Sequence, residues 1–297
     1  MKFIAVGFLL FTFGALLAIV SGANFVLDRF IIGYSILFTA HLSVSYSNDY
    51  FDFHSDQFSK PTAISGGSGV LANNPELRSF AKRFALFLIS LSIAFAIIFA
   101  ILYSFSIPFI LFVILGNLVG WYYTAPPLKL AYRRLGEIIA TIAVGLMMPG
   151  LGYYVLNSGF DTLFSVFIVP SMCYSFAFII SVEIPDFEGD KQSNKKTLIV
   201  YKGRKFGFRL VALLHSLATI YFLMISITNV LPSLISFSLF PILSLIPLAL
   251  AISGLIRQSD DRAVATGLVS NNLSAFAVFL LLVDFCVIFS LLLPPRP

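Results

Sequence analysis

The sequence predicts an all-α integral membrane protein with about nine transmembrane helices. Two observations lead to this fold class. Of the 297 residues, 59% are hydrophobic and only 11% are charged, and the apolar residues fall in long runs that give a mean hydropathy of +0.96. Because a soluble domain carries about 25% charged residues, this chain has too little polar surface to cover itself in water. We therefore expect lipid around it, rather than a soluble helical protein with a large core.

Nine runs are long enough to cross a bilayer, which takes about 20 mostly apolar residues. No linker or low-complexity stretch divides them, so we expect a single transmembrane domain over residues 1–297. The predicted spans are 3–21, 30–48, 84–104, 106–124, 137–156, 162–182, 208–228, 231–255 and 267–293.

Breakers and polar residues mark the ends of these spans in order. The first run leads through Gly22-Ala23-Asn24 straight into the second, which favours a membrane span over a cleavable signal. Pro108 lies near the start of the fourth span, Pro126-Pro127 follow it, and Pro232 begins the eighth, because proline is tolerated at the ends of helices and disrupts their interiors.

Basic residues gather on one side of this topology. Of the 19 lysines and arginines, all except Arg29 and Arg296 lie before the first span, or in or beside the loops that follow the even-numbered spans. Basic loops stay in the cytoplasm. We therefore expect a multi-pass protein of the cell membrane, with its N-terminus and the large loops 49–83 and 183–207 in the cytoplasm. The formal charge of +5 is small, and the expected partner is the bilayer rather than a nucleic acid.

Two acidic stretches follow the second and sixth predicted spans at this same face. Each contains three carboxylates, spaced by three residues and then by four: Asp49, Asp52 and Asp56, and then Glu183, Asp186 and Asp190. On a helix this spacing places the side chains on one face. Carboxylates so close together repel each other unless a cation lies between them.

Paired rows of carboxylates are suited to Mg²⁺, which takes one or two of them together with waters and substrate phosphates. The sequence predicts that Mg²⁺ is held by Asp49, Asp52, Asp56, Asp186 and Asp190, and bridges to a diphosphate. Nearby groups would bind the remaining phosphate charge, and the candidates are Asn48, Lys60, Lys129 and Lys191, with Lys195 close by. The alternative is that each row is a solvated helix end, which two matching rows on one face disfavour.

These two stretches are where the chain resembles a known family, the UbiA superfamily of intramembrane prenyltransferases. "NDYFDFHSD" is similar to its NDxxDxxxD motif and "DFEGD" to its second, DxxxD motif. The nine spans and two large loops also agree. "SGGSGVL" and "GWYYTAPPLKLAYRRLGE" resemble the 1,4-dihydroxy-2-naphthoate polyprenyltransferases of menaquinone synthesis. In contrast to that branch, Val182-Glu183 stand where an Asn-Asn pair is usual, and no Arg-Pro region precedes the first span.

The resemblance implies a helical bundle with a cytoplasmic cap over the active site. It also implies Mg²⁺-dependent transfer of a polyprenyl group from an allylic diphosphate to an aromatic acceptor, with Asp49, Asp52, Asp186 and Asp190 as the catalytic residues. For a naphthoate acceptor it implies decarboxylation. An allylic cation is stabilised by aromatic faces. The candidate substrate-binding residues are Tyr123, Tyr50 and Phe53 for that cation, and Arg133 and Arg134 for an acceptor carboxylate.

The sequence also leaves other functions open. The acceptor could instead be 4-hydroxybenzoate or geranylgeranylglyceryl phosphate. A cation-coupled transporter also uses membrane carboxylates, but near the midplane and on broken helices. A CDP-alcohol phosphotransferase requires an Asp-Gly and Ala-Arg pattern that "DYFDFHSDQF" lacks. "SGGSG" has no Lys-Ser/Thr after it, so it is not a P-loop. His41 is isolated, and a packed histidine is expected there.

Overall fold

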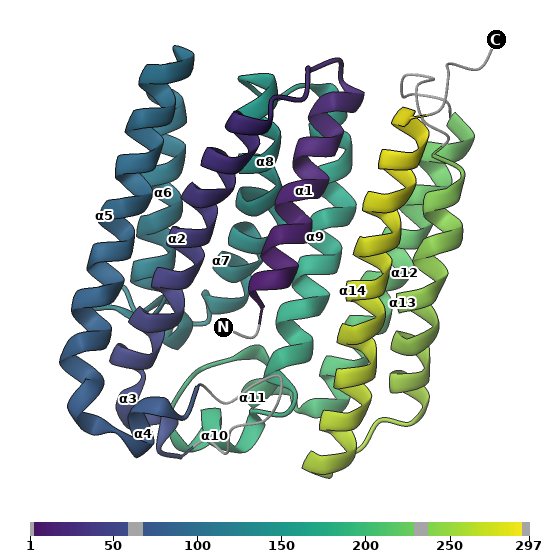
Figure 1. Ribbon diagram of the computed structural model, residues 1–297. Coiled ribbons are helices and arrows are strands. Elements are labelled where there is room, and N and C mark those ends of the chain that lie inside the picture. Colours follow the sequence, from purple (N-terminus) through teal and green to yellow (C-terminus); the bar gives the residue numbers. More distant parts are fainter. Residues whose placement is uncertain (1–2, 59–67, 229–236, 293–297) are drawn as a thin grey trace.

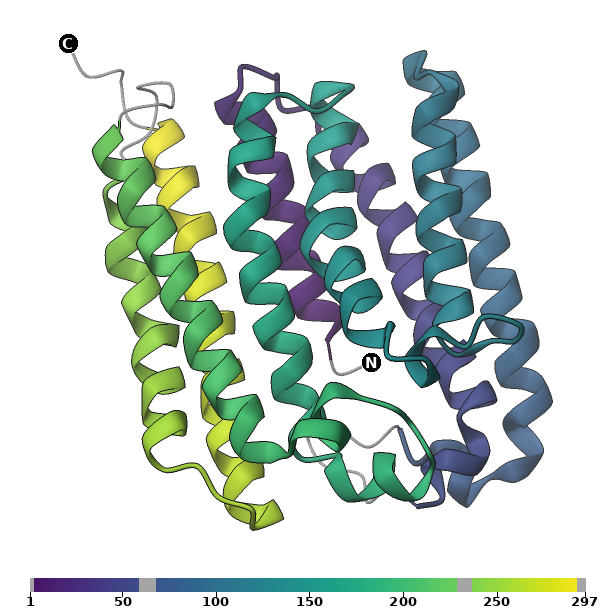
Figure 2. The same ribbon diagram turned by 180° about the vertical axis from the view of Figure 1, so that it is seen from behind.

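The structure is a computed structural model that describes residues 3–58, 68–228 and 237–292. Within these ranges all regular secondary structure is helical, which confirms the predicted fold class. The long helices run roughly side by side and form a bundle (Figures 1 and 2). They are α1 (Ile4–Val20), α2 (Leu27–Phe51), α5 (Arg78–Tyr103), α6 (Ile107–Thr124), α9 (Thr162–Glu183), α12 (Arg204–Thr228), α13 (Leu239–Ile256) and α14 (Arg262–Leu292).

One further long helix is built from three pieces: α7 (Gly136–Ile142), a π-helical turn η3 (Ala143–Met147) and α8 (Met148–Asn157). Pro149 has no N–H to donate to the carbonyl oxygen of Gly145. The hydroxyl of Ser171 in α9 donates to that oxygen instead, at 2.7 Å. The irregular turn is thereby held by a neighbouring helix.

Eight helical segments in the described part of the chain are long and apolar enough to cross a membrane. The first predicted span, 3–21, corresponds to α1, a shorter apolar helix of 17 residues. Gly22 follows it with a φ of +102°, a conformation that glycine adopts easily and that ends the helix. The multi-pass architecture is confirmed, and a count of nine spans stays a prediction.

Short helices gather at one end of the bundle, where Figure 1 shows α3, α4, α10 and α11 together. Their bounds are α3 Phe53–Asp56, α4 Val70–Asn73, α10 Phe187–Gln192 and α11 Leu198–Lys202, with two short 3-10 turns, η1 Pro75–Leu77 and η2 Leu130–Tyr132. They lie where the sequence predicts a cap. That this end faces the cytoplasm stays a prediction.

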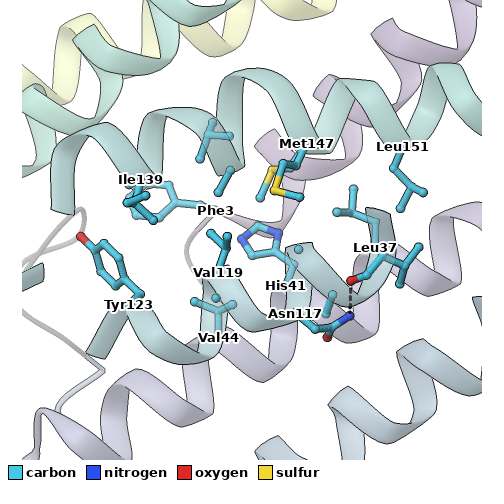
Figure 3. Close-up of a pocket in the computed structure, with 18 of the residues that line it drawn as sticks. Phe3, Leu37, His41, Val44, Asn117, Val119, Tyr123, Ile139, Met147 and Leu151 are labelled. Carbon is cyan, nitrogen blue, oxygen red and sulfur yellow. Dashed lines mark hydrogen bonds between the residues drawn. The ribbon is translucent and has the colours of Figure 1, made fainter. Parts of the chain in front are cut away.

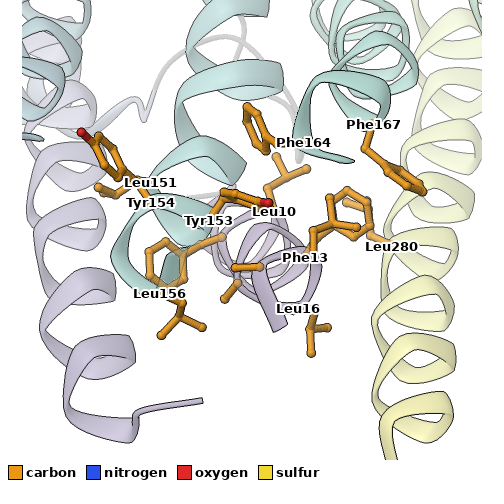
Figure 4. Packing of buried hydrophobic residues seen from close by; sticks show 14 of the residues in the cluster. Leu10, Phe13, Leu16, Leu151, Tyr153, Tyr154, Leu156, Phe164, Phe167 and Leu280 are labelled. Carbon is orange, nitrogen blue, oxygen red and sulfur yellow. The ribbon is translucent and has the colours of Figure 1, made fainter. Parts of the chain in front are cut away.

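The centre of the bundle is packed through glycines and aromatic rings. A Cβ atom on Gly14 of α1 would lie 1.8 Å from the carbonyl oxygen of Pro149, and one on Gly152 of α8 would lie 1.9 Å from that of Phe11. Small residues let helices approach closely in a membrane, so α1 packs directly against α8. Around this contact Figure 4 shows buried side chains from α1, α8 and α9, including Phe13, Tyr153 and Phe164.

Candidate active site

The first acidic stretch lies where α2 gives way to α3. Asn48 and Asp49 belong to the last turn of α2, Asp52 lies at the junction, and Asp56 ends α3. The helix is broken at Asp52, yet the Asp52 N–H donates to the Asn48 carbonyl and the Asp56 N–H donates to the Asp52 carbonyl, each at 2.8 Å. These bonds keep the helical register across the break.

The second acidic stretch has a similar backbone. Glu183 ends α9, Asp186 lies at the junction before α10, and Asp190 lies within α10. The Asp190 N–H donates to the Asp186 carbonyl at 2.9 Å. Helix α10 contacts α3, so the fold brings the two stretches together.

A partly buried lysine joins the two stretches. The ammonium of Lys195, in the segment after α10, lies 2.9 Å from Oδ2 of Asp52, and the side chain of Lys195 is only 18% exposed. The hydroxyl of Tyr132 donates to Oδ1 of the same carboxylate at 2.8 Å. Burial lowers the pKa of Lys195, but Asp52 and Asp190 raise it by more, so it lies well above its usual value. Lys195 therefore stays charged at the centre of the cluster.

One lysine does not neutralise all of these carboxylates. The pKa of Asp56 is raised to about 7, by burial first and then by Asp52, Asp49 and Asp186. The pKa of Asp190 is also raised to about 7, by burial first and then by Asp186, Asp52 and Asp56. Lys195 opposes both shifts without cancelling them. The cluster is therefore short of positive charge.

This donor set fits Mg²⁺ bound together with a substrate. Among the described residues no group of three or more His, Cys, Asp or Glu side chains is arranged to hold a metal by itself. Mg²⁺ does not need such a cage, because it binds one or two carboxylates and fills its other positions with water and phosphate oxygens. A cluster of hard oxygen ligands that lacks positive charge meets that requirement.

The other predicted diphosphate ligands differ in their exposure and contacts. Lys60 lies outside the described residues. Lys129 and Lys191 are exposed, with their ammonium groups 5.9 Å from the ring centres of Tyr132 and Phe187, respectively. Asn48 accepts a hydrogen bond from the Thr124 hydroxyl at 2.9 Å.

The predicted acceptor-binding arginines lie on the surface. Arg133 is exposed and donates to the carbonyl oxygen of Pro127 at 2.9 Å. Arg134, also exposed, lies over the ring of Tyr201 at 5.2 Å.

An apolar cavity of about 370 Å³ extends into the bundle from the acidic end. Asn48 of the first stretch lines it, as do Tyr123 and Val182, the residue before Glu183. Its other walls come from α2, α6, the broken helix α7–α8 and α9, as Figure 3 shows. Of the three aromatic residues predicted for the cation, Tyr123 lines this cavity.

Tyr50 and Phe53 lie elsewhere. The guanidinium of Arg78 lies 4.9 Å from the ring centre of each, and neither is among the residues that line the cavity. Their positions in α2 and α3 direct them toward α5, so the prediction that they face an allylic cation does not agree with the geometry.

Sequence reasoning did not single out two side chains at the centre of the site. Lys195 lies five positions after Asp190, which is not a helical spacing, and it is 143 residues from Asp52 along the chain. Tyr132 comes from a separate loop, 80 residues from Asp52. No sequence pattern pairs either one with that aspartate.

Comparison with known proteins adds an independent line of evidence. The model of the UbiA prenyltransferase family matches residues 8–266. A curated relative, 1,4-dihydroxy-2-naphthoate octaprenyltransferase of Bacillus subtilis (strain 168), is 27% identical over 116 residues. This match covers 39% of the chain and 37% of the relative, so it spans little more than a third of the relative's length.

Solved structures share the fold at low sequence identity. A UbiA homologue from Archaeoglobus fulgidus bound to GPP and Mg²⁺ is 16% identical, with a TM-score of 0.66 over 97% of this chain and 100% of that chain. A digeranylgeranylglyceryl phosphate synthase is 18% identical, with a TM-score of 0.65 over 96% and 93%. A UbiA homologue from Aeropyrum pernix K1 is 14% identical, with a TM-score of 0.64 over 92% and 97%. These likenesses confirm the predicted bundle architecture.

Proposed function

The chain belongs to the UbiA prenyltransferase family, and we propose that it transfers a polyprenyl group from an allylic diphosphate to 1,4-dihydroxy-2-naphthoate, with loss of carbon dioxide. This reaction would place it in menaquinone synthesis. The observation that carries the proposal is a charged site at the end of an apolar cavity, with Asn48 next to the aspartates and in the cavity wall. Such a junction suits a substrate with a diphosphate at one end and a hydrocarbon tail at the other.

The acidic end would bind the diphosphate. Mg²⁺ is proposed on Asp49, Asp52, Asp186 and Asp190, with Asp56 in support, and when bound it supplies positive charge for the leaving group. Lys195 would move from Asp52 onto the diphosphate once the metal neutralises that carboxylate. Asn48, Lys129 and Lys191 are proposed as further phosphate ligands.

The cavity would protect the reactive carbon. When the bond between C1 and the diphosphate oxygen breaks, the electron pair leaves with the diphosphate and an allylic cation remains. Apolar walls would exclude water and so prevent its hydrolysis, and the ring of Tyr123 offers a π face to its charge. The tail would lie among apolar side chains, where each buried CH₂ contributes about 0.8 kcal/mol.

The acceptor would then form the new carbon–carbon bond. The electron-rich ring carbon that carries the carboxylate attacks C1, and the bond to that carboxylate breaks. Carbon dioxide leaves, and its bonding pair restores the aromatic ring. Arg133 and Arg134 are proposed to attract the acceptor carboxylate before this step.

The naphthoate acceptor is favoured by the similarity to the Bacillus subtilis enzyme and by the segment at residues 120–137. The carboxylates gather at one end of the bundle, beside Lys195, which favours phosphate chemistry over the cation-transport alternative. We also propose that this end faces the cytoplasm, because the basic loops lie there.

The proposal is tested with purified protein, Mg²⁺, geranylgeranyl diphosphate and three acceptors: 1,4-dihydroxy-2-naphthoate, 4-hydroxybenzoate and geranylgeranylglyceryl phosphate. We expect a decarboxylated prenyl-naphthol by mass spectrometry that disappears with EDTA. Product from another acceptor alone would overturn the naphthoate assignment and keep the prenyl transfer. No product and no pyrophosphate, also with longer donors, would overturn both.

A further inference from the structure

The cavity has two chemically different walls. Its polar lining side chains come from α2 and α6, and they are Asn48, His41, Asn117 and Tyr123. The wall formed by α7, η3, α8 and α9 is apolar, with residues such as Ile139, Val144 and Ile179. A hydrocarbon prenyl tail forms no hydrogen bonds. The polar side chains of this wall therefore indicate a second, polar ligand.

His41 and Asn117 lie at the same depth in that wall. The hydrogen bond between Thr124 and Asn48 sets α6 beside α2. His41 precedes Asn48 by seven residues and Asn117 precedes Thr124 by seven, and α2 and α6 run in the same direction, since that hydrogen bond joins their C-terminal ends. With a rise of 1.5 Å per residue, both lie about 10 Å from that hydrogen bond. Figure 3 shows the His41 ring among the lining side chains, with Asn117 on the neighbouring helix.

Asn117 presents an acceptor that has no partner. Its Nδ2 donates to the Val113 carbonyl at 3.0 Å and to the Ser92 hydroxyl at 3.2 Å. Because a carbonyl oxygen only accepts, these bonds fix which end of the amide is nitrogen. Ser92 in turn donates to the carbonyl of Ile36 at 3.0 Å. The remaining atom, Oδ1, is buried and accepts no hydrogen bond among the described residues.

His41 is held by packing. Its ring lies against Gly7, where a Cβ atom would come within 2.7 Å of Nδ1. In the described part of the chain no hydrogen bond joins this ring to another side chain or to the backbone. Buried polar groups in proteins are almost always hydrogen-bonded. Asn117 Oδ1 is such a group. The partly buried His41 ring lines the same cavity at the same depth, and together they indicate a polar ligand between the helices.

We propose that Asn117 and His41 bind the second hydroxyl of a hydroquinone-type acceptor, one whose ring carries a hydroxyl remote from the attacking carbon. The proposal rests on the proposed prenyl transfer and narrows its acceptor. Asn117 Oδ1 accepts only, so it binds a hydroxyl and repels a carboxylate or a phosphate. An acceptor with a carboxylate at that position, such as 4-hydroxybenzoate, would therefore be disfavoured.

The dimensions of the polar wall agree with this assignment. Reacting atoms approach to about 3–3.5 Å, and a hydrogen bond to the hydroxyl takes about 2.8 Å. The depth from the Asn48–Thr124 hydrogen bond to His41 and Asn117 is about 10 Å. When these two distances are subtracted, roughly 4 Å remain, which one aromatic ring spans. The prenyl tail then lies along the apolar wall opposite.

The experiment compares 1,4-dihydroxy-2-naphthoate with 1-hydroxy-2-naphthoate, which lacks the second hydroxyl. Equilibrium binding of each is measured by calorimetry, without oxygen, to the wild type, Asn117→Leu and His41→Phe. We expect the wild type to prefer the dihydroxy compound about tenfold. The preference should fall to about one in Asn117→Leu and partway in His41→Phe. Val113→Ala, in the same wall, removes no polar group and should keep the preference.

A wild type without preference, or a full preference in both variants, overturns the subsite. If Asn117→Leu fails to fold, His41→Phe decides alone, and an unchanged preference there overturns the proposal. Turnover is measured in parallel. A wild type that forms product but shows no preference refutes the subsite alone, whereas a wild type that forms no product from any acceptor refutes the proposed function.

Discussion

The two acidic stretches share a backbone plan but differ in what surrounds them. In each, a long helix ends, an aspartate lies at the junction, and a short helix carries the last aspartate. In the first stretch Asp52 is held by Lys195 and Tyr132, both groups within the cluster. In the second stretch Arg204 binds the backbone carbonyl of Ile184 and the side chain of Glu188, outside the carboxylate cluster.

Arg204 is buried at 3% exposure. It donates to the carbonyl of Ile184 at 2.9 Å and to that of Asp260 at 2.8 Å, and it forms an ion pair with Glu188. The second stretch is therefore fixed by the scaffold. The first is fixed by groups that a diphosphate and a metal could displace. The second stretch is therefore the rigid half of the site, and the first stretch is its adaptable half.

The largest effect is expected when the central aspartate of either stretch is removed. Asp52→Asn and Asp186→Asn should each lower turnover about a thousandfold, because a metal contributes several kcal/mol to stabilising a leaving group. Pyrophosphate release measures this loss. Asp28→Asn, an exposed aspartate at the other end of α2, is the control. Full activity in both variants would remove the metal assignment.

The rigid half is tested through stability. Arg204→Met should lower the free energy of unfolding by about 2–3 kcal/mol, because it removes bonds to two carbonyls and one partner of an ion pair. Lys205→Met, which breaks an exposed ion pair with Asp260, should cost less than about 1 kcal/mol. Thermal unfolding in detergent compares the two. Equal losses would mean that Arg204 does not anchor the second stretch.

The adaptable half is tested by comparing Lys195, which binds Asp52, with the exposed Lys191. Lys195→Met should raise the KM for prenyl diphosphate about tenfold or more, because Lys195 is partly buried beside Asp52 and a charge-assisted hydrogen bond contributes about 1.5–3 kcal/mol. Lys191→Met, at an exposed position, should raise it less than about threefold. Equal effects would place Lys195 outside the diphosphate site.

The sequence predicted the helical bundle and the two stretches, because apolar runs and carboxylate spacing are local features. It could not predict Lys195 or Tyr132 beside Asp52, because that contact depends on how loops fold over the end of the bundle. Tyr50 and Phe53 show the same limit. They follow the motif closely in sequence, yet the break at Asp52 leaves them against Arg78.

A pH dependence is expected to be shared by both halves. Asp56 in the first stretch and Asp190 in the second have pKa values of about 7, raised mainly by burial, so both hold protons below that pH. A metal ligand must be deprotonated. Mg²⁺ affinity should therefore rise with pH through 7 and level off above about 8, by up to about tenfold per unit for each proton released.

Calorimetry of Mg²⁺ binding in buffers of different ionisation enthalpy counts these protons directly. In the wild type, protons should be released near pH 6.5 and not at pH 9. Asp190→Asn should release fewer protons on Mg²⁺ binding, because only Asp56 then titrates in this range. If the two halves contribute equally, Asp56→Asn should release the same smaller number of protons. An affinity that stays flat from pH 6 to 8, without proton release, would mean that neither carboxyl group responds to the metal.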